Sequence, residues 1–252
     1  MTALPNIVAI ILTRMTSTRF PGKALVEICG QPNLLRMIRR VKASKKISKI
    51  CVATTVNATD DPIIFACDKE NITTFRGDEE DVLSRVYYAA KEMRAEIVVR
   101  LTADCPMIDP ALIDDVISMY LEGDWDYVAN GNIRSYPDGL DVEVFSMSAL
   151  QRAHREARHP FLREHVTPYI RGSHPLYGSG EFRVGNKVSP WDFGHIRWTL
   201  DTKEDLAVIQ ALVARLPDGY GWMDALSVAT RYPALLGTQT CSVTVAELTE
   251  KK

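Results

Sequence analysis

The first 121 residues alternate between short apolar runs and amphipathic segments, and this rhythm limits the possible folds more than any other feature. The run Ile7–Leu12 is apolar at every position, which is typical of a strand buried on both faces of a parallel sheet. Further strands are predicted at 50–54, 73–75 and 96–101, and helices at 32–43, 60–69, 80–94 and 110–121. Strands that alternate with helices are joined by crossovers, so we expect an α/β fold with a doubly wound, mostly parallel sheet.

The pattern changes after about Asn130. Residues 138–145 alternate with a period of two, which predicts a half-exposed antiparallel strand. Residues 169–194 are rich in Gly, Ser, Pro and His and predict extended loops or a small hairpin. A strand at 195–200 and a helix at 202–216 then restore the earlier rhythm. Trp191 and Trp198 are expected to be packing residues.

The length of 252 residues fits one large domain that carries an insertion, because domains contain about 150 residues on average. We therefore expect a single domain over residues 1–236. Within it, residues 131–195 are expected to form a small inserted lobe that contacts a second substrate or another subunit. Residues 237–252 are expected to be a tail.

Charge and cysteine content argue against several classes of protein. The 30 basic and 32 acidic side chains nearly cancel, so the overall charge favours neither a nucleic-acid partner nor a membrane surface. No apolar run is long enough for a membrane span, and the first residues lack a basic segment followed by an apolar run, so we expect neither a membrane span nor a secretory signal. The 5 cysteines are scattered and form no C-x-x-C pair, which is typical of reduced thiols. We expect a cytoplasmic protein.

A basic loop follows the first predicted strand. It contains three cations, three small hydroxyl residues and a glycine: Arg14, Arg19, Lys23, Thr16, Ser17, Thr18 and Gly22. Parallel sheets bind ligands at the carboxyl ends of their strands, and this combination of groups suits phosphate oxygens. The spacing matches neither the Walker loop nor the dinucleotide fingerprint. A solvated surface loop is the alternative interpretation.

Two aspartates follow predicted strands. Asp104 follows the strand at 96–101 and Asp201 follows the strand at 195–200. Mg²⁺ is commonly held by one or two carboxylates together with substrate phosphates, so these residues and the basic loop predict a site for a nucleoside triphosphate and Mg²⁺. Helix-start roles are the alternatives, and they fit Asp109 before Pro110 and Thr202 well.

Seven segments, in order and spacing, resemble the SpsF-like cytidylyltransferases and, more distantly, the cytidylyltransferases that activate 3-deoxy-manno-octulosonate and the acylneuraminates. They are Leu12–Lys23, Val52–Thr55, Phe75–Arg85, Arg100–Pro106, Tyr136–Phe145, Arg163–Tyr169 and Arg197–Asp201. The resemblance implies a three-layer α/β/α fold like that of nucleotide-diphospho-sugar transferases. It also implies that the enzyme transfers CMP from CTP to a sugar or sugar acid, releases pyrophosphate and serves surface polysaccharide or glycan synthesis. A homodimer is implied as well.

The resemblance assigns roles residue by residue. The implied catalytic residues are Arg14, Lys23, Asp104 and Asp201, of which Asp104 and Asp201 would hold Mg²⁺. The implied nucleotide-binding residues are Leu12, Thr13, Arg14, Ser17, Thr18, Arg19, Lys23, Arg76, Asp81, Arg85, Thr102 and Ala103. The implied acceptor-binding residues are Asp138, Asp141, Glu164, His165 and Arg197. His165 or Asp141 would be a general base if the acceptor is a hydroxyl, although a structural helix histidine is an equal interpretation of His165.

Two other activities are alternatives. The first is a CTP-dependent cytidylyltransferase that acts on a phosphonate or a phosphorylated small acceptor. The second is a glycosyltransferase that consumes a nucleotide-sugar and holds its metal with an Asp-x-Asp motif. The basic loop argues against the second alternative.

Overall fold

A computed structural model describes residues 5–172 and 181–237, and its elements follow the predicted alternation closely. The strands are β1 (Ile7–Leu12), β2 (Glu27–Ile28), β3 (Gln31–Pro32), β4 (Lys49–Thr55), β5 (Thr73–Gly77), β6 (Ile97–Thr102), β7 (Tyr127–Ala129), β8 (Glu143–Ser146) and β9 (Val184–Asn186). The helices are α1 (Asn33–Lys42), α2 (Asp61–Lys69), α3 (Val82–Glu92), α4 (Pro110–Glu122), α5 (Met147–Glu156), α6 (Pro160–His165), α7 (Pro168–Arg171), α8 (Lys203–Val213) and α9 (Trp222–Arg231). Short 3₁₀ turns lie at Ala58–Asp60 and Pro233–Leu235.

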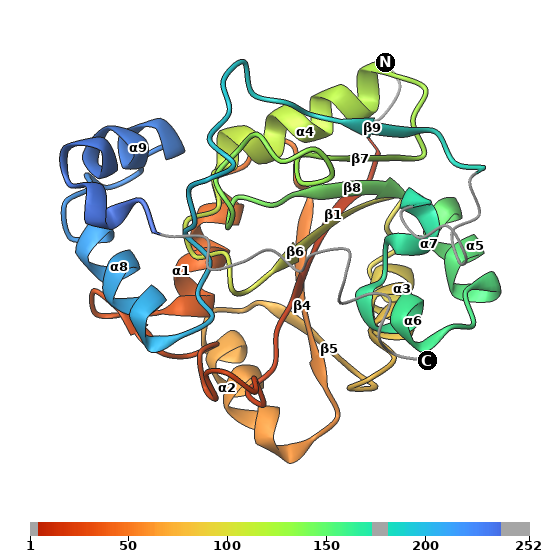
Figure 1. Cartoon of the computed structure of the whole chain (residues 1–252). Coiled ribbons are helices and arrows are strands. Elements are labelled where there is room, and N and C mark those ends of the chain that lie inside the picture. The colour runs from red at the N-terminus through yellow and green to blue at the C-terminus, as the bar shows by residue number, and fades with distance from the viewer. Residues whose placement is uncertain (1–4, 173–180, 238–252) are drawn as a thin grey trace, which may run out of the picture.

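The main sheet has the strand order β5-β4-β1-β6-β8-β7-β9 (Figure 1). Its neighbours are parallel except for β8, which is antiparallel to both β6 and β7. The chain passes from β1 outward through β4 to β5 and then returns to the other side of β1 as β6. The strand order therefore reverses between β1 and β6, where Leu12 is opposite Thr102.

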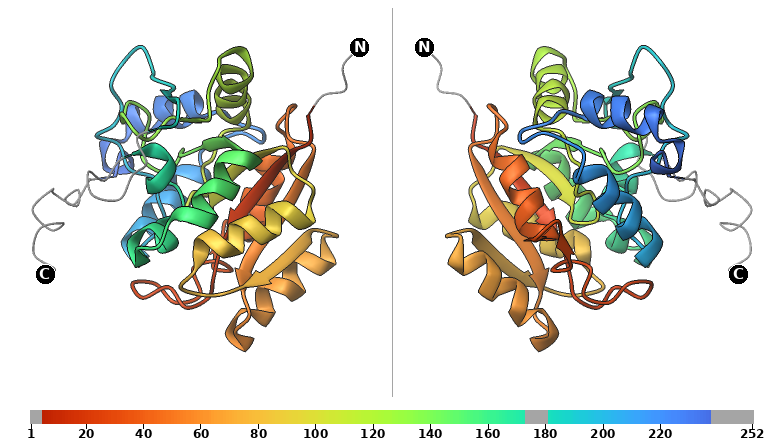
Figure 2. Two further views of the ribbon diagram at one scale, coloured as in Figure 1. Left: turned by 90° about the vertical axis from the view of Figure 1, so that its right-hand side faces the viewer. Right: turned by 90° about the vertical axis from the view of Figure 1, so that its left-hand side faces the viewer.

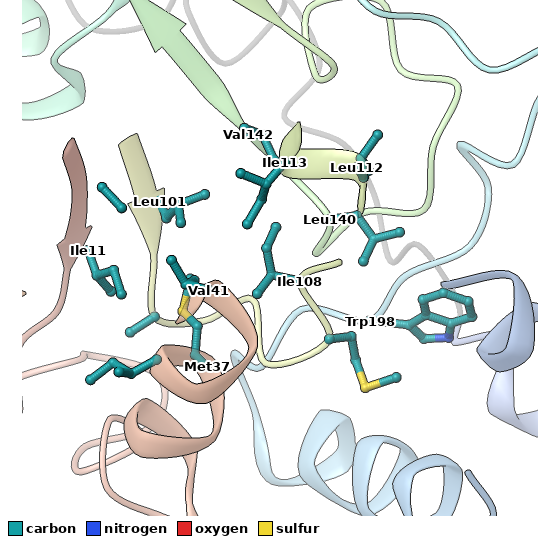
Figure 3. Close-up of a cluster of buried hydrophobic side chains, with 14 of the residues drawn as sticks. Ile11, Met37, Val41, Leu101, Ile108, Leu112, Ile113, Leu140, Val142 and Trp198 are labelled. Atoms are coloured by element: carbon teal, nitrogen blue, oxygen red, sulfur yellow. The ribbon is translucent and has the colours of Figure 1, made fainter. Parts of the chain in front are cut away.

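Helices cover both faces of this sheet and make the three-layer α/β/α arrangement (Figure 2). Alternate residues of β1 face opposite layers: Ile11 packs in a core with α1, α2, α4, α8 and α9, whereas Ile10 packs in a core with α3, α5, α6 and α7. Figure 3 shows the first core, where Leu101 of β6 lies near Met37 and Val41 of α1. Burial of these alternating apolar sets explains why the sheet lies in the middle of the molecule.

The second half differs from its predicted arrangement in two places. Residues 195–200 form no strand, because their backbone amides bond to three separate segments. Arg197 N donates to Leu236 O at 3.0 Å, Trp198 N to Asp138 O at 2.7 Å and Leu200 N to Asp104 O at 2.8 Å. The segment 131–195 supplies β8 and β9 of the main sheet as well as α5, α6 and α7. It is therefore built into the sheet, and β9 pairs with β7 in place of the expected hairpin.

Several smaller expectations can be compared with the structure. Trp198 is fully buried, as expected, and its indole nitrogen donates to Leu235 O at 3.0 Å. Trp191 was expected to pack as well, but it is 69% exposed. Cys29, Cys51, Cys67 and Cys105 are free thiols, while Cys241 and most of the predicted tail lie outside the described residues. None of the described helices is both long and apolar enough to cross a bilayer.

Candidate active site

A cavity of about 970 Å³ lies at the carboxyl ends of β1 and β6, where the strand order reverses. Open α/β sheets bind their ligands in this place, because the helices that follow the two strands diverge and leave a crevice. Ala103 N donates to Leu12 O at 2.9 Å, so the residues after both strands enter the cavity side by side. The basic loop leaves β1 here, and the segment that carries Asp104 leaves β6.

The basic loop is held in place by the buried carboxylate of Asp60. This carboxylate accepts bonds from Met15 N at 2.8 Å, from the Thr54 hydroxyl at 2.7 Å, and from Thr55 N and its hydroxyl at 3.0 and 2.6 Å. Burial raises the pKa of Asp60, but these hydrogen bonds outweigh burial and leave the pKa below its ordinary value. Asp60, which the sequence places at the start of the helix predicted at 60–69, therefore also fixes the basic loop.

Each cation of the loop pairs with a carboxylate. Lys23 Nζ lies 2.8 Å from Asp201 Oδ1 and 3.3 Å from Asp104 Oδ2, and it also donates to Leu200 O at 2.9 Å. Arg19 lies 3.0 Å from the same oxygen of Asp201. Arg14 lies 3.0 Å from Glu79 Oε1, which also accepts the Thr16 hydroxyl at 2.7 Å. All three cations line the cavity, where they are available to a triphosphate.

Asp104 and Asp201 converge although no strand precedes Asp201. Thr202 caps α8, and Asp205 completes the capping box, so the side chain of Asp201 is free to face the cavity. Arg197 donates to Asp201 Oδ2 at 2.6 Å and to Asp205 Oδ1 at 2.7 Å, which fixes the orientation of Asp201. Burial raises the pKa of Asp104, but the charge of Lys23 and hydrogen bonds from Thr102, Lys23 and the backbone together outweigh burial and keep the pKa below its ordinary value.

Mg²⁺ fits this pair of carboxylates. Their oxygens already approach a single cationic nitrogen, that of Lys23. The described residues contain no cluster of three or more potential metal ligands. A bound Mg²⁺ would therefore rely on two carboxylates, substrate phosphates and water, which is the ligand set that this ion commonly adopts.

Arg85 also lines the cavity. Its guanidinium is buried and donates to Asp78 O at 2.7 Å, while its Nε has no partner among the described residues. Burial, and then the nearby charge of Arg14, lower its pKa to about 10. Asp81 caps α3 and accepts a bond from Arg163 at 2.5 Å. A buried arginine with an unpartnered donor is suited to bind an acceptor group of a ligand.

The structure brings most of the predicted site residues together. The first cavity is lined by Leu12, Thr13, Arg14, Ser17, Thr18, Arg19, Lys23, Asp81, Arg85, Thr102, Ala103, Asp104, Glu164, His165 and Asp201. Four predicted residues do not line it: Arg76, Asp138, Asp141 and Arg197. Arg76 instead donates to Thr55 O, Asn57 O and Asp61, and so it holds the loop before α2.

A second cavity of about 440 Å³ shares Arg100, Thr102 and His165 with the first. Asp141 lines it, and burial raises the pKa of Asp141 to about 6 even though Arg134 is 3.3 Å away. Asp138 pairs with Arg134 at 3.0 Å and with Arg197 at 3.6 Å, so Asp138 and Arg197 support the walls of both cavities from behind.

Four arginines of the two cavities are absent from the predicted set, namely Arg100, Arg134, Arg163 and Arg171. Arg100 forms an ion pair with Glu143 and lines both cavities. Arg163 bonds to Asp81 and the Ser84 hydroxyl, and Arg171 donates to Asn132 at 3.2 Å. Arg100 had a visible signal, because it is a charged residue inside an otherwise apolar strand. Arg163 begins one of the segments that carry the family resemblance, whereas Arg134 and Arg171 had no signal.

The chain contains one Asp-x-Asp spacing, Asp124-Trp125-Asp126, but it lies elsewhere. These residues precede β7, which runs parallel to β6, so they lie at the edge of the sheet opposite the cavity. Both carboxylates pair with Arg183. This geometry gives no support for a glycosyltransferase metal site.

The reversed strand order, the phosphate-suited loop and the paired aspartates define an α/β nucleotide-binding protein. Comparison with known proteins then specifies the family: the cytidylyltransferase model matches residues 8–213, so the chain belongs to the cytidylyltransferase family. It is 35% identical over 216 residues to the spore coat polysaccharide biosynthesis protein SpsF of Bacillus subtilis, covering 82% of this chain and 86% of that protein.

Two further comparisons agree. A 3-deoxy-manno-octulosonate cytidylyltransferase of Geobacter sulfurreducens is 35% identical over 117 residues, which cover 46% of each chain. A solved cytidylyltransferase of Leptospira borgpetersenii superposes with a TM-score of 0.87 at 29% identity, covering 94% of this chain and 99% of that one. The predicted fold class and family resemblance are thus confirmed.

Proposed function

We propose that this cytidylyltransferase transfers CMP from CTP to a sugar or sugar acid with Mg²⁺, releasing pyrophosphate, in the synthesis of a surface polysaccharide or glycan. The observation that carries the proposal is the convergence of Lys23, Asp104 and Asp201 at the switch point of the sheet. Cations for a triphosphate and carboxylates for its metal ion thereby occupy one cavity. The similarity to SpsF supports the polysaccharide role.

The reaction requires little covalent chemistry from the protein. An oxygen of the acceptor attacks the α-phosphorus of CTP, and the bond from that phosphorus to the pyrophosphate oxygen breaks. Negative charge grows on the leaving pyrophosphate, where Arg14, Arg19 and Lys23 would stabilise it. Asp104 and Asp201 would hold Mg²⁺, which neutralises phosphoryl oxygens when it is bound. Arg85, with its unpartnered Nε, would donate to the acceptor atoms of cytosine.

The second cavity would hold the acceptor. Arg171 has no carboxylate partner among the described residues, which leaves a positive charge available for an acidic group of the acceptor. Asp141, whose pKa burial raises to about 6, would accept the proton of an attacking hydroxyl as a general base. His165 lines both cavities and lies at their junction.

We also propose that the chain is a cytoplasmic homodimer, as the family resemblance implies. In the described part of residues 131–195, three large apolar side chains on adjoining segments are exposed, namely Ile133, Val188 and Trp191. Asn186 joins these segments through two hydrogen bonds with the backbone of Ile133. Burial of such side chains between two copies would favour association. Analytical ultracentrifugation tests the dimer, and a monomer at micromolar concentration would refute it.

The test is pyrophosphate release from CTP and Mg²⁺ with a panel of acceptors. The panel contains 3-deoxy-manno-octulosonate, an acylneuraminate, a neutral hexose and a small phosphonate. We expect turnover with an acidic sugar, and we expect Asp104→Asn and Asp201→Asn each to reduce it by about 10²-fold or more. Asp124→Asn is the matched control, because Asp124 lies at the opposite sheet edge. Turnover with the phosphonate alone would show that the acceptor is a phosphonate or a phosphorylated small molecule. Unchanged turnover in both Asp104→Asn and Asp201→Asn would refute the proposal that these residues hold Mg²⁺.

A further inference from the structure

The turn that follows helix α6 holds a strained backbone. Val166 has φ 71° and ψ −62°, and Thr167 N donates to His165 O at 2.9 Å. A hydrogen bond across a single residue with these angles is a γ-turn of the positive-φ form, which is rare and strained. Four non-glycine residues have positive φ in the described chain, and Val166 is the β-branched one among them. Branching at Cβ makes this conformation costly.

Packing keeps Val166 in this conformation. Its side chain is fully buried, and it lies in the same core cluster as Leu162 and Ile170. Its backbone N–H still donates to Leu162 O at 3.2 Å, so the helix ends with its bonds satisfied before the chain turns. The core therefore fixes a conformation that an isolated chain would avoid.

The residues on either side of the turn belong to the active site. His165 lines both cavities, and its ring lies with its centroid 4.5 Å from that of Phe161. Thr167 is buried, and its hydroxyl donates at 2.7 Å to Glu143, the partner of Arg100. One tight turn thus connects the junction of the two cavities to a buried ion pair below it.

We infer that Val166 is a positioning residue, whose strained turn fixes His165 at the junction of the nucleotide and acceptor cavities. The names of the two cavities rest on the proposed function, whereas the strain and the position of His165 do not. Strained conformations persist where the surrounding structure determines them, and they cluster at functional sites. A relaxed turn of the same length would let the end of α6 move away from Arg100 and Thr102.

The surroundings of His165 provide a readout of its position. Partial burial lowers the pKa of His165, the charges of Arg100 and Arg171 lower it further, and Glu164 opposes them. Arg100 comes from β6 and Arg171 from α7, so two elements other than α6 influence the ring. If the ring moves outward, the pKa returns toward its ordinary value of about 6.5.

The first experiment compares Val166→Gly with Val166→Ala by guanidinium unfolding. Both variants lack the isopropyl group, so they differ mainly in their tolerance of positive φ. We expect the glycine variant to have the higher unfolding midpoint, because glycine populates positive φ readily. Val8, equally buried in the same cluster but within β1, is the matched control. At position 8 we expect the glycine variant to have a lower unfolding midpoint than the alanine variant, as is usual within a strand.

The second experiment measures the pKa of His165 by NMR titration of histidine ring signals, assigned with His165→Gln. We expect the pKa to rise in Val166→Ala, which lacks the packing that holds the positive φ, and to stay unchanged in Val8→Ala, while the affinity for CTP with Mg²⁺ changes less than twofold. An alanine variant at position 166 that is more stable than the glycine variant would overturn the inference, as would an unmoved His165 pKa. Absence of CTP binding in the wild type would refute the proposed function alone, because the other readouts need no ligand.

Discussion

Replacement of Asp60 by asparagine should weaken both the fold and the binding of CTP. One oxygen of Asp60 accepts Met15 N, and the other accepts the Thr54 hydroxyl together with Thr55 N and its hydroxyl. In asparagine an NH₂ group takes the place of one of the two carboxylate oxygens. Since both oxygens of Asp60 accept hydrogen bonds, at least one buried donor loses its acceptor. That loss costs about 1–3 kcal/mol, and the bonds that remain change from charged to neutral, at up to about 1 kcal/mol each. We expect a total loss of about 3 kcal/mol.

Guanidinium unfolding measures the stability, and isothermal titration with CTP and Mg²⁺ measures the binding. Binding should weaken because Met15, which loses its anchor, lies next to Arg14 in the basic loop. Asp61→Asn is the matched control, since Asp61 is exposed and its one ion pair among the described residues is with Arg76. We expect that control to cost less than about 1 kcal/mol. A loss below 1 kcal/mol in Asp60→Asn, with CTP binding intact, would refute the anchoring role.

The same carboxylate predicts a dependence on pH. The pKa of Asp60 is lower in the folded chain than its ordinary value, so its contribution to stability is complete above about pH 4. This contribution is lost as the pH falls through the folded-state pKa. The wild type should therefore lose more stability than Asp60→Asn between pH 5 and pH 3. Parallel acid unfolding curves for the two proteins would contradict this sign.

Three further predictions concern the cavity and its supports. Lys23→Ala should reduce CTP turnover by about 10²–10³-fold in kinetic assays, while circular dichroism shows that the chain stays folded. A loss of thermal stability with unchanged CTP affinity would instead show that the basic loop has only a structural role. Thr202→Ala removes the cap of α8 and should cost about 1 kcal/mol in denaturant unfolding, and an unchanged midpoint would contradict the capping role. Gly139 has φ 101°, and a Cβ there would lie 2.7 Å from the backbone of Trp198. Gly139→Ala should therefore reduce the free energy of unfolding by about 3 kcal/mol. Unchanged stability would show that the backbones of residues 139 and 198 can move apart.

The sequence predicted the first half of the fold well, because local patterns determine it. Buried strands such as Ile7–Leu12 and the amphipathic helices between them are visible as runs and periods. The second half was harder because its backbone pairing is not local. Residues 195–200 have the composition of a strand but bond to three separate segments, and no pattern within six residues can show this.

The site shows the same division. The basic loop and Asp104 follow strands that the sequence predicts, so their meeting at one sheet edge could be foreseen. The expected strand before Asp201 does not exist, and the bond from Leu200 N to Asp104 O brings Asp201 to the cavity instead. Asp60 and Met15 are 45 residues apart in the sequence, and that contact depends on tertiary structure alone.

The pairing of Lys23 with Asp104 and Asp201 also has a consequence for discrimination among ions. A free divalent cation that approaches these carboxylates must displace the Lys23 ammonium group, which then keeps its bond to Leu200 O but has no anionic partner. A free phosphate that approaches the ammonium group must separate it from two anions that then repel each other. Only a metal ion and a polyphosphate that arrive together offer every displaced charge a new partner. On the proposed function, the same contacts would disfavour single ions and admit a metal ion and a nucleotide together.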